Sequence, residues 1–246
     1  MTAKQIPQHI SQQFQHELEG IRSRVLEMGG LVEQQLTEAL EALVKHDLGL
    51  AETVATSDHK VDIFEVRLDE ECTEIIARRQ PAASDLRLIL AVIRIITDLE
   101  RVGDEAEKIG RMVIQLLEIE GSNSYYVGVL AMGQHVREML NAALNAFARM
   151  DSKEALRIAQ QEPRIDREYD ATMRQLITYM MEDPRNITRS LDVVWIARAL
   201  ERISDHAANI CESVIYLVEG KDIRHTNYEA DGIVSAEVLS NSLPKP

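Results

Sequence analysis

The feature that most constrains this chain is a long stretch without proline in which apolar residues recur every three or four positions. The 73 residues from 8 to 80 contain no proline. Apolar side chains at such intervals lie on one face of an α-helix, whereas a half-buried strand would alternate them one by one. The first run stops at the polar segment 45–47, which predicts one long bundle helix before it. Its apolar positions are Ile10, Phe14, Leu18, Ile21, Val25, Met28, Val32, Leu36, Leu40 and Leu43.

The same periodicity predicts five further helices. A second run covers residues 54–75 and stops at Pro81, and a third helix, capped by Ser84 or Asp85, should reach about residue 120. The segment Gly-Ser-Asn-Ser at 121–124 is the clearest break in the chain. The remaining helices are expected at 129–147, from a cap at Asp151 to Glu182, and from 183–186 to Gly220.

Composition excludes several classes of protein. Lys and Arg number 27 against 41 Asp and Glu, and the net charge of −14 disfavours binding to nucleic acid or to an anionic membrane surface. The two cysteines, Cys72 and Cys211, lie far apart on apolar helical stripes, so we expect small core residues in a reducing cytoplasm. Neither a secretory h-region nor an 18-residue apolar stretch is present, which predicts a cytoplasmic chain without membrane spans.

An internal repeat divides the chain. Shifting the sequence by 101 residues (200 − 99) aligns 99–109 with 200–210, and six of the eleven positions are identical. A shift of 104 (162 − 58) aligns an earlier pair of acids, so the intervening turns differ in length. We therefore predict an all-α fold of two tandem antiparallel three-helix bundles related by internal duplication. The predicted domains are 1–120 and 121–220, followed by a disordered C-terminal tail at 221–246.

The repeated positions are mainly acidic. Each half has one (D/E)xxxD element on its second helix and another on its third, and residues four apart share a helical face. Pro81 is 19 residues from both Asp62 and Glu100, so an antiparallel hairpin places the two elements at the same height. Four converging carboxylates repel one another unless a cation or protons compensate, and oxygen ligands suit Mg²⁺, Mn²⁺, Ca²⁺ or iron. The predicted metal ligands are Asp58, Asp62, Glu100, Asp104, Glu162, Asp166, Glu201 and Asp205.

The two predicted sites are not equivalent. Glu65 and Asp69 are candidates to join the first site, whereas Tyr169 and Met173 occupy the matching positions of the second. We also expect Pro163 to kink the fifth helix, which would alter the direction of its acids.

Readings without a metal remain open. A single ExxxD element usually marks a solvated helix face, and the repeated Arg101 and Arg202 could pair with the acids in a purely structural cluster. His206 is a candidate metal ligand or base, although a hydrogen-bonded surface histidine is the commoner case. Trp195 is expected in the core or at an interface.

Sequence motifs of catalysis are missing. None of the seven histidines has a glutamate three residues before it, as di-iron bundles require. The sequence also has no GxxxxGK phosphate loop and no Gly-x-Ser-x-Gly elbow. We therefore expect a protein that is not an enzyme, with a carboxylate-bridged metalloenzyme as the alternative function and a metal-free scaffold as a third.

Segment 79–87 (RQPAASDLR) followed by 98–104 (DLERVGD) resembles the PhoU family of phosphate-signalling proteins, and the resemblance extends over about residues 8–220. It implies tandem three-helix bundles whose E(D)xxxD motifs bind metal clusters, here on the eight acids named above. Magnesium, manganese, iron and zinc all remain open as the divalent or trivalent ion.

The resemblance also implies a biological role. A PhoU-like protein would negatively regulate the phosphate-starvation (Pho) response as a non-enzymatic adaptor. It would couple the ATPase subunit of the Pst phosphate transporter to a PhoR-type sensor histidine kinase. The expected state is a cytoplasmic homodimer that reaches the inner face of the membrane only through these partners.

Overall fold

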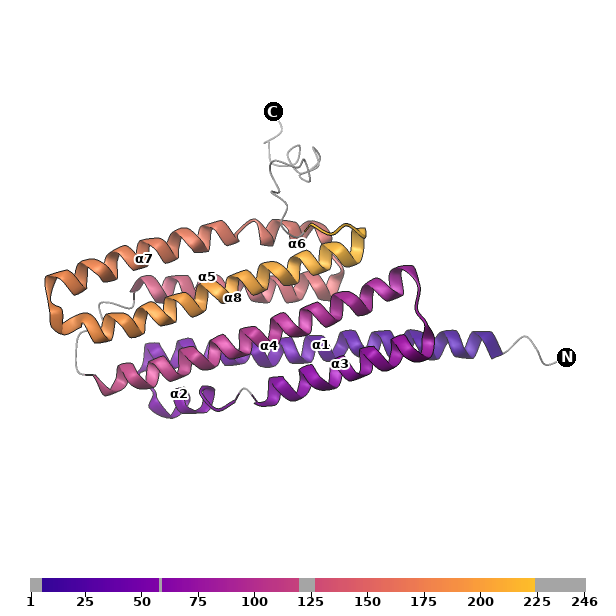
Figure 1. Cartoon of the computed structure of the whole chain (residues 1–246), viewed down its shortest axis with the longest axis horizontal. Helices are drawn as coiled ribbons and strands as arrows, with labels where there is room; N and C mark the ends of the chain where they lie inside the picture. Colours follow the sequence, from indigo (N-terminus) through magenta and orange to yellow (C-terminus); the bar gives the residue numbers. More distant parts are fainter. Residues whose placement is uncertain (1–5, 58, 120–126, 224–246) are drawn as a thin grey trace, which may run out of the picture.

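A computed structural model describes residues 6–57, 59–119 and 127–223. All regular elements in these ranges are helical, which confirms the predicted all-α class with two tandem three-helix bundles (Figure 1). The middle helix of each bundle is interrupted, so that each half contains four α-helices. The first half contains α1 (Ile6–Lys45), α2 (Leu48–Val54), α3 (His59–Arg79) and α4 (Ala83–Glu118). The second contains α5 (Val127–Arg149), α6 (Ser152–Ala159), α7 (Glu162–Glu182), the 3₁₀ turn η2 (Pro184–Asn186) and α8 (Ile187–Glu219).

The turn before each short helix is repeated. Asp47 caps α2 by accepting a hydrogen bond from the Leu50 amide at 3.0 Å, and Asp151, 104 positions later, caps α6 by accepting one from the Glu154 amide at 3.0 Å. Such caps satisfy backbone donors that have no partner within the helix. The cap predicted at Asp151 is therefore confirmed, and the duplication includes backbone detail.

Two predictions about helix boundaries are wrong. The fifth helix does not bend at Pro163; it ends at Ala159, and α7 begins afresh with Pro163 in its first turn. Proline is tolerated there because its missing N–H would have had no intrahelical acceptor. At the start of α4, Ala82 is the N-cap residue and makes no side-chain hydrogen bond, so neither Ser84 nor Asp85 is the cap.

Reciprocal glycine contacts join α1 to α5. A Cβ atom on Gly29 would lie 2.5 Å from Leu144 Cδ2, and one on Gly133 would lie 2.6 Å from Leu40 Cδ2. Both glycines and both leucines are 104 positions apart, so each half offers a leucine to a glycine of the other. The two halves thus pack across a pseudo-twofold axis at a distance that only glycine permits.

The central pair of helices is α4 and α8, which run antiparallel side by side in Figure 1 and pack more extensively than any other pair. Two charge contacts cross between them. Arg202 Nη1 lies 3.1 Å from Glu105 Oε1, and His206 Nδ1 lies 2.9 Å from Asp98 Oδ1. The halves therefore share both core and charge compensation.

Three other predictions concern single residues. Cys72 and Cys211 are buried core residues, as expected. Trp195 is 61% exposed, so it is not a core residue, and the interface alternative stays a prediction. Ile223, within the predicted tail, is buried against the core, while residues 224–246 lie outside the described residues and their disorder remains a prediction. No described helix has the length and apolarity to cross a bilayer.

Candidate metal centres

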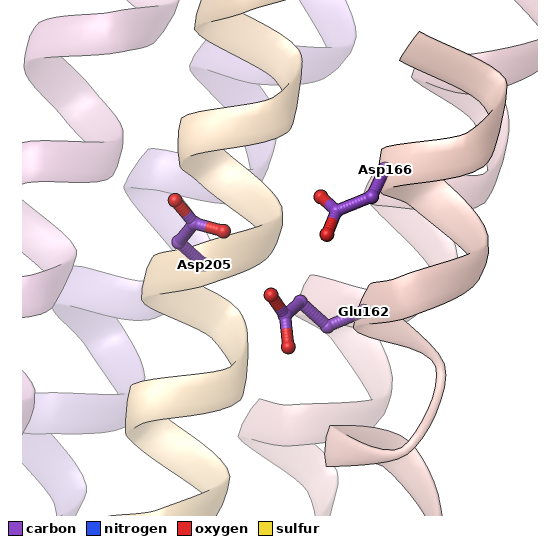
Figure 2. A group of neighbouring side chains, drawn as sticks. All are labelled: Glu162, Asp166 and Asp205. Carbon is purple, nitrogen blue, oxygen red and sulfur yellow. The ribbon is translucent and has the colours of Figure 1, made fainter. Parts of the chain in front are cut away.

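Three carboxylates of the second half converge between α7 and α8. Glu162 and Asp166 lie on the first two turns of α7 and face Asp205 on α8 (Figure 2). One oxygen of each lies within 4.8 Å of one oxygen of each of the others. Glu162 is the first residue of α7, which is a separate helix from α6 and begins directly after the break at residues 160–161. The position of Glu162 relative to α8 therefore depends on where α7 begins. Three of the four predicted second-half acids are thus brought together, two from α7 and one from α8.

Burial and mutual repulsion raise the pKa values of Glu162 and Asp205. Desolvation is the largest cause at Glu162, followed by the charges of Asp166 and Asp205. Desolvation and then Asp166 raise the pKa of Asp205, against smaller opposing effects of His206, Arg198 and Arg202. Glu162 and Asp205 therefore hold protons more tightly in the folded chain than free carboxylates do, because desolvation and the neighbouring acids outweigh the opposing positive charges.

Glu201 is the fourth acid of this half. Its Oε1 accepts a hydrogen bond from Arg198 Nη1 at 2.6 Å, whereas its Oε2 is buried and has no hydrogen-bond partner among the described residues. Desolvation and the charge of Asp205 raise its pKa. A buried carboxylate oxygen without a donor is costly unless a cation or proton reaches it. Glu201 is not part of the converging group, so its role as a ligand stays a prediction that this buried oxygen supports.

In the first half the described acids act on one another electrostatically, but no three of them converge as closely as Glu162, Asp166 and Asp205 do. The pKa of Glu100 on α4 is raised by desolvation and then by the charges of Asp104, Glu65 and Asp62. Glu65, a candidate rather than a principal ligand in the sequence, also accepts a hydrogen bond from Thr97 Oγ1 at 3.3 Å. Asp58 lies outside the described residues, and its place in the site stays a prediction.

Two further acids differ from the sequence-based expectation, one in each half. Asp69 is exposed and is not among the charges acting on Glu100, so the structure does not bring it into the group. Conversely, Glu212 on α8 raises the pKa of Glu162 and was missed. The counterpart of Glu212 in the first half is Arg111, so the repeat gives no indication of a role for Glu212. The sequence signal that could have identified Glu212 is its position seven residues after Asp205, on the same helical face.

The repeated arginines do not neutralise the clusters. Arg202 forms its ion pair with Glu105 of the other half, and it acts on Asp205 only as the weakest of the causes that lower the pKa. Arg101 is exposed and is the last of the causes acting on Glu100. Because the pKa values are raised on balance, the structural alternative of arginine-paired acids lacks its expected contacts.

His206 is not a surface residue. It is 8% exposed, and its Nδ1 contacts Asp98 of α4 across the interface between the halves. Its counterpart by the repeat, Glu105, is also buried in this interface. Neither residue is available to a metal between α7 and α8, and both serve the joining of α4 to α8.

The donor set fits a hard cation. All the grouped side-chain atoms are carboxylate oxygens, three of which converge while a fourth, at Glu201, is buried without a donor. Mg²⁺, Mn²⁺, Ca²⁺ and oxidised iron prefer such ligands. A bound cation would supply the positive charge that these residues lack, and the acids of α7 and α8 would hold both helices to it.

Comparison with known proteins decides the family. A sequence profile described as the PhoU domain matches twice, at residues 25–113 and 129–214. The chain belongs to the PhoU family. The two matches begin 104 residues apart (129 − 25) and end 101 apart (214 − 113), the same two shifts as the internal repeat of the sequence.

Relatives and solved structures of the PhoU family agree over nearly the whole chain. The Pseudomonas putida homologue of the phosphate-specific transport system accessory protein PhoU is 54% identical over 96% of this chain and 94% of its own length. The Escherichia coli protein of that name is 45% identical over 92% and 93%. The crystal structure of PhoU from Pseudomonas aeruginosa superposes with a TM-score of 0.82 at 52% identity, covering 85% of this chain and all of that one. The Streptococcus pneumoniae PhoU structure gives 0.78 at 31% identity, over 85% and 98%.

Proposed function

We propose that this chain is a metal-binding regulatory adaptor that acts as an accessory to a phosphate-specific transport system. It negatively regulates the phosphate-starvation response by coupling the ATPase subunit of the Pst transporter to a PhoR-type sensor kinase. It works in the cytoplasm, at the inner face of the membrane, as a homodimer. The name of its relatives, phosphate-specific transport system accessory protein, supports the transport role.

The single observation that carries the metal part of this proposal is the unbalanced carboxylate cluster of Glu162, Asp166 and Asp205. The raised pKa values of Glu162 and Asp205 mean that their charged forms cost stability in the absence of a cation, and a bound cation would offset that cost. The ligand set that we propose is the eight acids of the sequence repeat, supplemented by Glu65. The predicted domains, 1–120 and 121–220, then each hold one site.

The alternative, a carboxylate-bridged metalloenzyme, is the weaker candidate. The one histidine near the acids, His206, is buried against Asp98 and does not face them. A bundle that binds metal through carboxylates alone lacks the imidazole ligands on which di-iron enzymes rely. Phosphatase and oxidase assays after loading with iron or manganese test this alternative, and turnover that is lost in Asp205→Ala would establish it.

Elemental analysis is the decisive test of metal binding. Wild-type protein purified without chelator should carry metal in stoichiometric amounts, and the double variant Asp104→Ala/Asp205→Ala should carry almost none. Equal, near-zero metal in both would reduce the acids to a scaffold or docking surface. A chelator that leaves the melting temperature of the wild type unchanged would support the metal-free scaffold, because a ligand of the native state alone must raise stability.

The partner proposal needs its own measurement. Purified protein should bind a purified transporter ATPase subunit and the cytoplasmic part of a PhoR-type kinase, and deletion of its gene should derepress phosphate-starvation genes in phosphate-rich medium. Binding to neither partner, with unchanged repression, would contradict the adaptor role while leaving metal binding intact.

A further inference from the structure

A groove outside the acidic clusters runs between α4 and α8. It has a volume of about 470 Å³, within the range of pockets that bind ligands or anchor side chains. Near its middle lies Trp195, 61% exposed, with Met112 also in the lining. Two further apolar residues of α8, Ile187 and Leu191, are 42% and 46% exposed, and with Trp195 they recur every four residues. This spacing places all three on one face of α8.

The groove contains one charge without a partner. Asp192 is 9% exposed, lines the groove, and has no hydrogen bond or ion pair within the described parts of the chain. Burial alone raises its pKa. An unpartnered buried carboxylate lowers stability, so its presence three residues before an exposed tryptophan favours a role in binding.

The positive charges of the same groove are already paired. Lys108 and Arg202 both contact Glu105, and Arg198 pairs with Glu201. Asp192 is therefore the one charged side chain of the lining that has no partner among the described residues. The net charge of −14 adds long-range attraction for a basic partner.

The first half shows how such a site is completed. By the shift of 101 residues, Trp195 corresponds to Arg94 and Gln115 of the groove to Tyr216. The Arg94 guanidinium lies 4.7 Å from the centre of the Tyr216 ring, and its Nη1 lies 3.9 Å from Asp222 Oδ2. Guanidinium, aromatic ring and carboxylate thus form a complete set from within the chain. The second-half groove has the ring and the carboxylate but no free guanidinium among its lining residues.

We infer that the groove at Trp195 and Asp192 is a docking site for a partner protein, which inserts an arginine between the indole and the carboxylate. Apolar side chains of the partner, on the same face of a helix, cover Leu191 and Ile187. Guanidinium groups stack on indole and pair with carboxylates, and anchors of this kind dominate protein interfaces. The inference rests on the proposed adaptor role, to which it adds a surface and the chemistry of the partner.

A peptide titration tests this site directly. The chain has one tryptophan, so its fluorescence reports on the groove alone. The probe is a synthetic helical peptide with Leu, Leu and Arg at four-residue spacing; its matched control carries citrulline, which has the shape of arginine without the charge. We expect the arginine peptide to change Trp195 fluorescence and to bind at least tenfold more tightly than the citrulline peptide.

The matched variant is Asp192→Asn, which keeps the side-chain volume. It should weaken the arginine peptide at least tenfold, leave the citrulline peptide unchanged, and maintain or raise the melting temperature, because it removes an unpaired buried charge. A structural role for Asp192 would instead lower the melting temperature.

Three outcomes would overturn the inference. They are equal binding of the two peptides, unchanged binding to Asp192→Asn, and no fluorescence change at about 1 mM peptide, where even a millimolar site is half filled. Self-association that is lost in Trp195→Ala, without peptide binding, would instead assign the groove to a second copy of the chain. No metal enters the titration, and elemental analysis of Asp192→Asn should match wild type, so failure here and failure of the metal proposal are separable.

Discussion

Substitution of Asp205 by asparagine should change the stability of the protein in opposite directions with and without metal. In the metal-free protein the carboxylates of Glu162 and Asp166 repel that of Asp205 from within 4.8 Å. At this distance two unit charges interact by about 3.5 kcal/mol in an effective dielectric of 20 and by about 0.9 kcal/mol in bulk water. Asp166 is exposed and part of the repulsion is relieved by bound protons, so we expect Asp205→Asn to stabilise the chelated protein by about 1–2 kcal/mol.

With metal present, the variant loses a ligand. At a metal concentration of about 1,000 times Kd, binding stabilises the wild type by about 4 kcal/mol, whereas a hundredfold weaker site gains only about 1.4 kcal/mol. This loss exceeds the gain from relieved repulsion, so the variant should become the less stable of the two.

Thermal unfolding by circular dichroism, with chelator and then with Mn²⁺, measures both signs. About 2–4 °C per kcal/mol is expected for a chain of this size. Glu70→Gln, on the exposed side of α3, is the control and should change little in either condition. If Asp205→Asn destabilised the chelated protein, the repulsion argument would be wrong; equal stabilisation of variant and wild type by metal would exclude Asp205 as a ligand.

Three further predictions concern packing, caps and pH. Gly30→Ala should stabilise the protein by roughly 0.5–1 kcal/mol, because the added Cβ atom has open space around it. Gly29→Ala should destabilise it by roughly 1 kcal/mol on balance, because the added Cβ atom meets Leu144. Similar shifts of the urea midpoint in the two variants would contradict the close packing at Gly29. Asp47→Ala and Asp151→Ala should each cost about 1 kcal/mol of unfolding free energy, and equal loss on replacement by asparagine would exclude the cap as the cause. The pKa values of Glu162 and Asp205 are raised in the folded state, so the chelated wild type should gain stability over Asp205→Asn as the pH falls from neutral toward the ordinary carboxylate values of 4.5 and 3.8; a constant difference over this range would refute the raised pKa values.

The sequence predicts the long helices well because their apolar period is uninterrupted and their ends carry polar or proline residues. It does not predict the break after Val54, since Thr56 and Ser57 are also compatible with a helix. The break depends on tertiary packing: a Cβ atom on Gly110 of α4 would lie 3.0 Å from the Ala55 amide nitrogen. A contact between residues so far apart leaves no local signal.

The candidate site shows the same division between local and long-range information. Spacing of four residues correctly places Glu162 beside Asp166, and the alignment of the acids by the repeat correctly brings Asp205 to them. The direction of His206 could not be predicted, because a helix in the middle of two packed halves has apolar neighbours on several sides. Only the position of α4 determines that His206 meets Asp98.

Asp205 and His206 are consecutive residues of α8, and their side chains leave the helix in different directions. The side chain of Asp205 points toward α7 and the acids, and the side chain of His206 contacts Asp98 of α4. Any turn of α8 that draws Asp205 toward a cation therefore turns His206 through the same angle against the other half. In the first half Asp104 and Glu105 are adjacent in the same way: the charge of Asp104 acts on Glu100, and Glu105 contacts Arg202 of α8. Each central helix therefore carries an acid of a candidate metal site next to a residue that contacts the other half. A cation bound in one bundle would therefore act next to a contact that joins the two halves.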